Sequence, residues 1–177
     1  FKINKLEICS TGAVVTLPSL PSPWSTKDLG AVGAAGSASF AGGLFTVLGS
    51  GADIGGTADE FRFVYQMASG DCSLVARVVS LANTDSGAKA GVMIRESLNP
   101  NAKHASTFIT PGSGVLFQYR TSTGGSSSKV SKSGLVAPYW LKVTRSGSTF
   151  TSYRSANGLS WTKISTQTVS MSSTVYI

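Results

Sequence analysis

The chain has few charged residues and no long apolar run, and both shortages limit what it can be. Of its 177 residues, 13% are charged, against a usual level of about a quarter. No apolar run approaches the roughly 20 residues that cross a bilayer, so we expect no membrane span. The sequence is still too apolar for a disordered chain. Its length suits one domain that buries a core without disulfides or metals.

Histidine and acidic residues are too few and too scattered for an active site. His104 is the single histidine, which leaves zinc hydrolysis without its usual ligands. No nucleophile-elbow pattern surrounds any serine. A glycosidase needs two carboxylates across one sugar, whereas adjacent acids such as Asp59 and Glu60 point to opposite faces of a strand. We therefore expect that the chain is not an enzyme.

The net charge is positive, with 15 Lys and Arg against 8 Asp and Glu, or +7. Such an excess indicates either an acidic partner or a solubilising surface. We favour the second, because no run of five basic residues occurs. No basic stretch forms a nucleic-acid recognition motif, so nucleic acid is not an expected partner.

Short runs of β-branched and aromatic residues fill the chain, closed mostly by Gly, Asn, Ser or Pro. They occur at residues 42–48, 61–65, 74–79, 89–96, 107–110, 115–120, 139–145 and 149–154. Asn157-Gly158 is a strong hairpin-turn signal. No useful helical period interrupts the runs. The pattern predicts an all-β fold, a two-sheet antiparallel β-sandwich.

Three segments are expected along the chain. Residues 1–8 alternate apolar and polar and predict a strand, either of a preceding module or a donor strand. Residues 9–22 are rich in Pro, Ser and Thr and read as a linker. Residues 23–177 form the sandwich module. No turn follows Thr174-Val-Tyr-Ile177. Either the fold continues past it, or residues 1–8 complete the sheet, and an unfilled edge would invite strand addition.

The two cysteines, Cys9 and Cys72, leave two alternatives open. A bridge would tie the N-terminal segment to the sandwich, as secretion favours. Otherwise Cys72 is a small buried side chain and Cys9 is unpaired.

An ordered set of short motifs resembles a known family. It comprises Trp24, then residues 28–30, 36–37, 49–54, 59–65, 70–71, 76–78, 89–96, 138–142 and 155–161. The set resembles the bacterial concanavalin A-like, laminin-G-like jelly-roll module often appended to secreted glycoside hydrolases, close to the β-xylosidase C-terminal-like group. The resemblance covers roughly residues 21–177.

That resemblance implies a jelly-roll sandwich, an extracellular or cell-surface location, a carbohydrate-binding role and no catalytic residue. Members usually carry Trp at the position of Gly55, and often an aromatic residue at that of Gly87. Two stacking faces are therefore absent here. The family pattern also continues past residue 177 into a further strand.

Basic strand residues are the candidate sugar-binding groups. By alternation, Lys89 and Arg95 share the face opposite the core on residues 89–96. Arg77 and Arg120 lie on strands that could line the same open face, where such groups would bind hydroxyls or carboxylates. The alternative, which we favour, is that Arg95 and Lys89 pair with Asp59, Glu60 or Glu96.

Tyrosines are the candidate stacking residues. Tyr65, Tyr119 and Tyr153 could stack on a sugar while the phenol reaches water, and Tyr119 neighbours Arg120. Alternating aromatic residues in strands are more often core, and we expect Trp161 to clamp its own hairpin.

Asp53 and Asp59 make calcium a candidate structural ion, because a glycine-rich loop offers carboxylate and carbonyl oxygens. Hydrogen bonding within the turn is the favoured alternative. No other cofactor is expected.

The sequence as a whole predicts a non-catalytic carbohydrate-binding-like module of a larger secreted protein. Its partners would be a polysaccharide, with an acidic one as an option, and neighbouring modules or subunits. The alternative is a structural repeat of an extracellular fibre or adhesin, assembled through strand addition.

Overall fold

The computed structural model describes residues 19–177, and this part of the chain is all-β, as predicted. The strand predicted at residues 1–8, most of the linker and Cys9 lie outside the described residues. No helix in the described part is long and apolar enough to cross a membrane.

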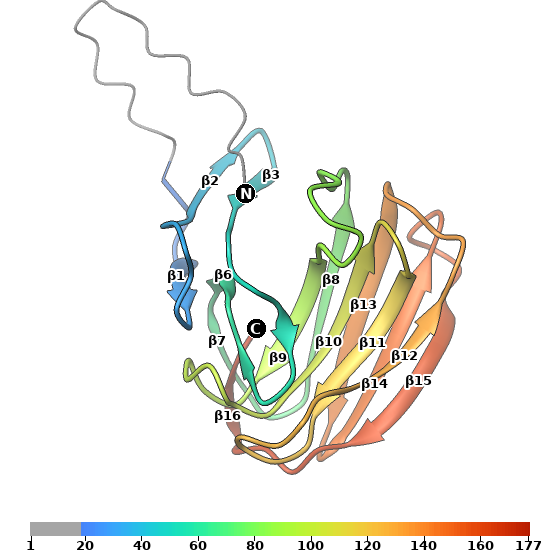
Figure 1. The fold of residues 1–177 in the computed structure, drawn as a ribbon. Coiled ribbons are helices and arrows are strands. Elements are labelled where there is room, and N and C mark those ends of the chain that lie inside the picture. The colour runs from blue at the N-terminus through green and yellow to red at the C-terminus, as the bar shows by residue number, and fades with distance from the viewer. Residues whose placement is uncertain (1–18) are drawn as a thin grey trace, which may run out of the picture.

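The strands form two larger antiparallel sheets and three two-stranded ribbons (Figure 1). The six-stranded sheet runs in the order β12 (Ser128–Lys132), β11 (Gly114–Arg120), β10 (His104–Thr110), β9 (Ala90–Arg95), β16 (Thr174–Tyr176) and β7 (Met67–Ser69). The four-stranded sheet runs in the order β15 (Thr162–Thr168), β14 (Thr149–Ser155), β13 (Tyr139–Ser146) and β8 (Cys72–Val78). The ribbons pair β1 (Ser25–Leu29) with β6 (Phe61–Tyr65), β2 (Ser37–Ala41) with β3 (Leu44–Leu48), and β4 (Ile54–Gly55) with β5 (Ala58–Asp59).

The main core lies between the two larger sheets, which pack in a sandwich-like arrangement. Alternation along β9 turns Val92 and Ile94 into this core, as predicted. They meet Leu141, Val143 and Phe150 of the four-stranded sheet, and all five side chains are buried.

A second core covers the other face of the six-stranded sheet. Met93, Phe108 and Leu116 pack there against Phe63 of β6 and Leu29 of β1. The face that the sequence left open to solvent is therefore covered in part by the β1–β6 ribbon.

The sheet has one weakly paired position, between β9 and β16. β9 pairs with β10 over six residues, from Arg95–His104 to Ala90–Ile109. On its other side a single pair, Tyr176–Arg95, joins it to β16. Among the described residues, the rest of that edge of β9 has no partner strand.

Cys72 begins β8, partly buried, and carries a free thiol in the described structure. Burial raises the pKa of this thiol above its usual value, as does Asp71, while Arg145 lowers it. Cys72 packs against the main core; because the structure does not describe Cys9, both alternatives for the two cysteines stay predictions.

Candidate functional site

Two arginines and one aspartate form a buried ionic cluster on the face of the six-stranded sheet opposite the main core. The Nη2 atom of Arg120 lies 2.6 Å from Oδ1 of Asp59, and Nη1 of Arg95 lies 3.2 Å from Oδ2. All three side chains are fully excluded from solvent. Burial lowers the pKa of Arg95 and Asp59 raises it, but an arginine remains charged throughout the ordinary pH range.

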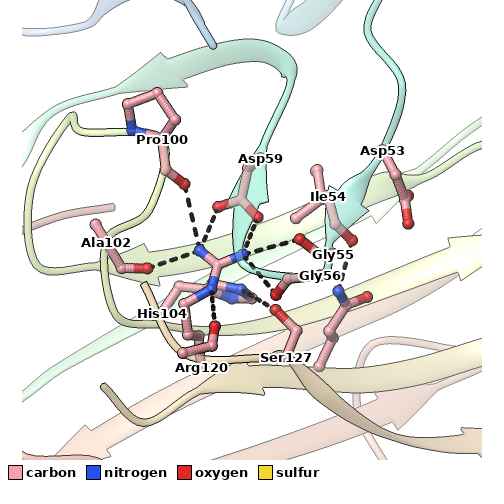
Figure 2. A network of polar contacts seen from close by, with 12 residues as sticks. Asp53, Ile54, Gly55, Gly56, Asp59, Pro100, Ala102, His104, Arg120 and Ser127 are labelled. Atoms are coloured by element: carbon pink, nitrogen blue, oxygen red, sulfur yellow. Dashed lines mark hydrogen bonds and ion pairs between the residues drawn. The ribbon is translucent and has the colours of Figure 1, made fainter. Parts of the chain in front are cut away.

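Arg120 uses its other hydrogen atoms to hold loops together (Figure 2). Its guanidinium donates to the carbonyl oxygens of Gly55 at 3.0 Å, Ala102 at 2.9 Å and Gly125 at 3.0 Å. Arg95 donates in the same way to the carbonyls of Ser97 and Asn99. The two arginines thus fix the loops above the sheet, because a buried guanidinium must satisfy its five donors.

The prediction that Arg95 and Arg120 lie on an open, solvent-exposed face is wrong, since both side chains are buried. Alternation correctly put them opposite the main core. It could not show that Phe61 and Phe63 of β6 would lie beside Arg95, with ring centroids 5.4 and 6.0 Å from its guanidinium carbon. The alternative of pairing with acids is confirmed for Arg95, which binds Asp59, whereas Lys89 binds Asp53 and not one of the expected acids.

A small polar pocket opens next to this cluster. Its volume is about 170 Å³. It is lined by Asp53, Gly55, Gly56, Lys89, Gln118, Ser127, Ser128 and Lys129. Two of the residues predicted as site residues, Lys89 and Asp53, therefore come together here.

Gln118 forms the buried wall of this pocket. Its Nε2 atom donates to the carbonyl oxygen of Ile54 at 2.5 Å, which fixes the orientation of the amide. Its Oε1 atom is buried and has no hydrogen-bond donor among the described residues. Such an acceptor costs about 1–3 kcal/mol when it stays unsatisfied. Because this oxygen is itself excluded from solvent, it lies beneath the pocket surface and is not open to a ligand in this structure.

An ion pair closes one side of the pocket. The ammonium group of Lys89 binds the carboxylate of Asp53. The Lys89 side chain is only 10% exposed, whereas that of Asp53 is 55% exposed. Lys89 is thus held in place, and its alkyl stem forms part of the wall.

The donor set at Asp53 and Asp59 does not fit calcium, which takes six to eight oxygen ligands. Both oxygens of Asp59 accept from guanidinium groups, and Asp53 binds Lys89. The described residues contain no group of three or more side chains suited to a metal ion.

Arg77 and Tyr119 lie elsewhere. Arg77 is exposed on β8 of the four-stranded sheet, opposite Trp140. Tyr119 packs against the main core, with its ring 5.4 Å from that of Phe117. The structure therefore divides the five predicted sugar-binding residues among the pocket, the ionic cluster, the core and a second surface.

His104 stands behind the pocket. Its Nε2 atom lies 3.5 Å from Oγ of Ser127, and its Nδ1 atom lies 3.0 Å from Oγ of Ser106. Burial lowers the pKa of His104 well below its ordinary value, and the charges of Arg120 and Arg95 lower it further. A general base must accept a proton, and the two guanidiniums oppose an imidazolium here. Ser127 and His104 consequently form a poor nucleophile–base pair.

A larger hollow of about 340 Å³ lies between residues 79–83, residues 109–111 and residues 136–137. No charged side chain lines it. We place the candidate site in the smaller pocket because that one combines ammonium, carboxylate, amide and hydroxyl groups.

Ser127, Ser128 and Lys129 were not among the site residues predicted from the sequence. These residues reach the pocket through strand pairing, since Lys129 of β12 lies opposite Gln118 of β11. No local pattern in the sequence predicts that register.

No family model, no curated protein and no solved structure matches this chain.

Proposed function

We propose that this chain is a non-catalytic carbohydrate-binding-like module of a larger secreted or cell-surface bacterial protein, with a concanavalin A-like jelly roll. It binds polysaccharide through the pocket at Gln118. The resemblance of the ordered sequence motifs supports this proposal, as does the sandwich-like packing of the two sheets.

The observation that carries the proposal is the pocket itself, where Lys129, Ser127 and Ser128 gather polar groups beside Gln118. A sugar hydroxyl that enters the pocket accepts from the ammonium group of Lys129. Ser127 and Ser128 supply further hydroxyls at the same opening. A ligand lacking a hydroxyl leaves these groups without a partner, so the pocket discriminates by hydrogen bonding.

The described carboxylates support a binding role because each has a structural partner. Asp28 binds Arg62, Asp53 binds Lys89, Asp59 binds two arginines and Glu96 binds Lys103. The carboxylates of Glu60, Asp71 and Asp85 accept backbone N–H groups from Ala52, Gly147 and Gly87, respectively. In the described structure, no two of these carboxylates face each other across a pocket, as the two carboxylates of a glycosidase do.

The test is a glycan and polysaccharide array, with and without calcium, at two salt concentrations, followed by titration of each hit. Lys129→Gln and Gln118→Met should each weaken binding about tenfold, as for a truncated contact residue. Lys132→Gln is the matched control, because Lys132 is exposed on the same strand and does not line the pocket. Silence across the array, or an equal loss from Lys132→Gln, would overturn the proposal.

A second candidate function is a structural repeat assembled by strand addition. The observation in its favour is the edge of β9 at Ala90–Ile94, which lacks a partner among the described residues. Both faces of this strand are apolar, with Val92 and Met93 each 3% exposed. An added strand would pair with the free backbone groups of this edge.

Sedimentation velocity over a range of protein concentrations tests this alternative. Strand addition predicts concentration-dependent assembly that Val92→Pro abolishes, since proline interrupts edge pairing. A monomer at every concentration would remove this candidate, and assembly that survives Val92→Pro would move the interface elsewhere.

A further inference from the structure

The four strands of the second sheet carry cations on their outer face and no acid within the strands. Strands β8, β13, β14 and β15 contain no Asp or Glu. Of their five basic residues, Arg145 and Arg154 bind backbone carbonyls and the hydroxyl of Tyr139. The other three, Arg77, Lys142 and Lys163, stand on the outer face, since they alternate with core residues along their strands.

Strand register puts these residues in a defined row. Val75 of β8 lies opposite Lys142, Lys142 lies opposite Tyr153, and Tyr153 lies opposite Lys163. Neighbouring strands are about 4.8 Å apart, so the row crosses about 14 Å of sheet. Arg77 extends the cationic surface on β8, beside Trp140.

Two aromatic rings flank the central ammonium group. The Nζ atom of Lys142 lies 4.2 Å from the ring centroid of Trp161 and 4.6 Å from that of Tyr153. Such contacts hold a lysine against the rings. Both rings are only partly buried, so they present surface to solvent next to a fixed positive charge.

Trp140 of β13 lies on the same face, in contact with the β14–β15 turn. A Cβ atom on Gly158 would lie 2.9 Å from Cε2 of this indole. The turn therefore rests directly on the Trp140 ring and holds the start of β15, with Trp161, close to Lys142.

We propose that this face binds an acidic polysaccharide, a chain of sugars that carry carboxylate or sulfate groups. The apolar faces of the sugars stack on Tyr153 and Trp161, and the anionic groups pair with Lys142, Lys163 and Arg77. The absence of acids from the four strands gives the charge complementarity. This surface extends the proposed function to a second ligand, and it shares no residue with the pocket.

The small number of cations on this face favours a polysaccharide over nucleic acid. A nucleic acid carries a phosphate at every nucleotide, and its affinity comes mainly from many lysine and arginine contacts. Three cations on three of the four strands provide few such contacts. A single-stranded oligonucleotide is therefore the competing ligand in the test.

The test measures the affinity of the purified chain for polygalacturonate and chondroitin sulfate, with dextran as a neutral polymer and oligothymidylate as the competitor. Trp161→Ala and Lys163→Gln should each weaken binding to an acidic polymer about tenfold. Both residues are at the surface, and circular dichroism establishes that each variant is folded. Lys132→Gln, an equal change of charge on the other sheet, should alter the affinity less than twofold.

The two binding surfaces are separable in this experiment. Lys129→Gln in the pocket should leave binding to the acidic polymers intact, and Trp161→Ala should leave the glycan bound by the pocket intact. The inference is overturned if neither acidic polymer binds, if Lys132→Gln weakens binding as much as Lys163→Gln, or if oligothymidylate binds as tightly. A failure confined to the pocket variants would remove the proposed pocket and leave this surface standing.

Discussion

Arg120 and Asp59 meet through a 2.6 Å ion pair between residues 61 positions apart in the chain, and neither side chain reaches solvent. Asp59 also binds Arg95, so one carboxylate balances two buried guanidiniums. The pocket at Gln118 depends on this arrangement, because Arg120 holds the carbonyl of Gly55 at the pocket wall.

Replacing Asp59 by Asn should therefore destabilise the fold strongly. We expect the free energy of unfolding to fall by about 3–5 kcal/mol, because two guanidiniums would stay buried without a counter-charge. Urea denaturation measures the loss. Asp53→Asn is the matched control, and should cost less than about 1 kcal/mol, since its carboxylate is 55% exposed. Equal losses from the two variants would contradict this account.

Acidification should destabilise the protein through His104. The folded state lowers the pKa of this imidazole, so between that value and the unfolded value of about 6.5 the unfolded chain binds more protons. Stability is complete above the unfolded pKa and falls as the pH drops below it, by up to about 1.4 kcal/mol per pH unit.

Urea denaturation at pH 7 and pH 5 measures this effect, and His104→Gln should remove most of the difference between the two. A variant that keeps the full dependence on pH would assign it to other groups.

Gly158→Ala should destabilise the β14–β15 turn. Gly158 has φ +76°, which costs an L-residue about 1–2 kcal/mol, and an added Cβ would press on Trp140. Gly134→Ala isolates the second effect, because Gly134 has φ +75° and nothing within 4 Å of its added Cβ. We expect a larger loss in urea denaturation for Gly158→Ala, with a change in near-ultraviolet circular dichroism. Indistinguishable losses would show that the indole moves freely.

Phe117→Ala should remove about 3–5 kcal/mol of stability, because this ring is fully buried in the main core. Leu159→Ala is the surface comparison: Leu159 is 84% exposed and its truncation should change stability by less than about 0.5 kcal/mol. Thermal and urea denaturation both report the difference, and a small effect of Phe117→Ala would contradict a packed sandwich core.

Local patterns in the sequence predicted the strands well. The expected runs at residues 61–65, 115–120 and 139–145 correspond to β6, β11 and β13. Period-two alternation is a property of neighbouring residues, and so it also put Val92 and Ile94 in the main core.

Coverage of a sheet face is not a local property, and there the sequence misled. Alternation put Arg95 on the face opposite the core but carried no information about β6, which lies over it. The same limit hid the contact of Lys142 with Trp161, which depends on the pairing of β13, β14 and β15. The contact of Trp140 with Gly158 was equally hidden, since it joins β13 to the β14–β15 turn.

The seven hydrogen bonds of Arg120 have a dynamic consequence. They join the carbonyls of residues 55, 56, 100, 102 and 125 to one side chain and one carboxylate. None of these three loops can open without exposing the same buried charge. Their amide protons should therefore exchange with solvent as one cooperative unit, slower than is usual for loops of their length.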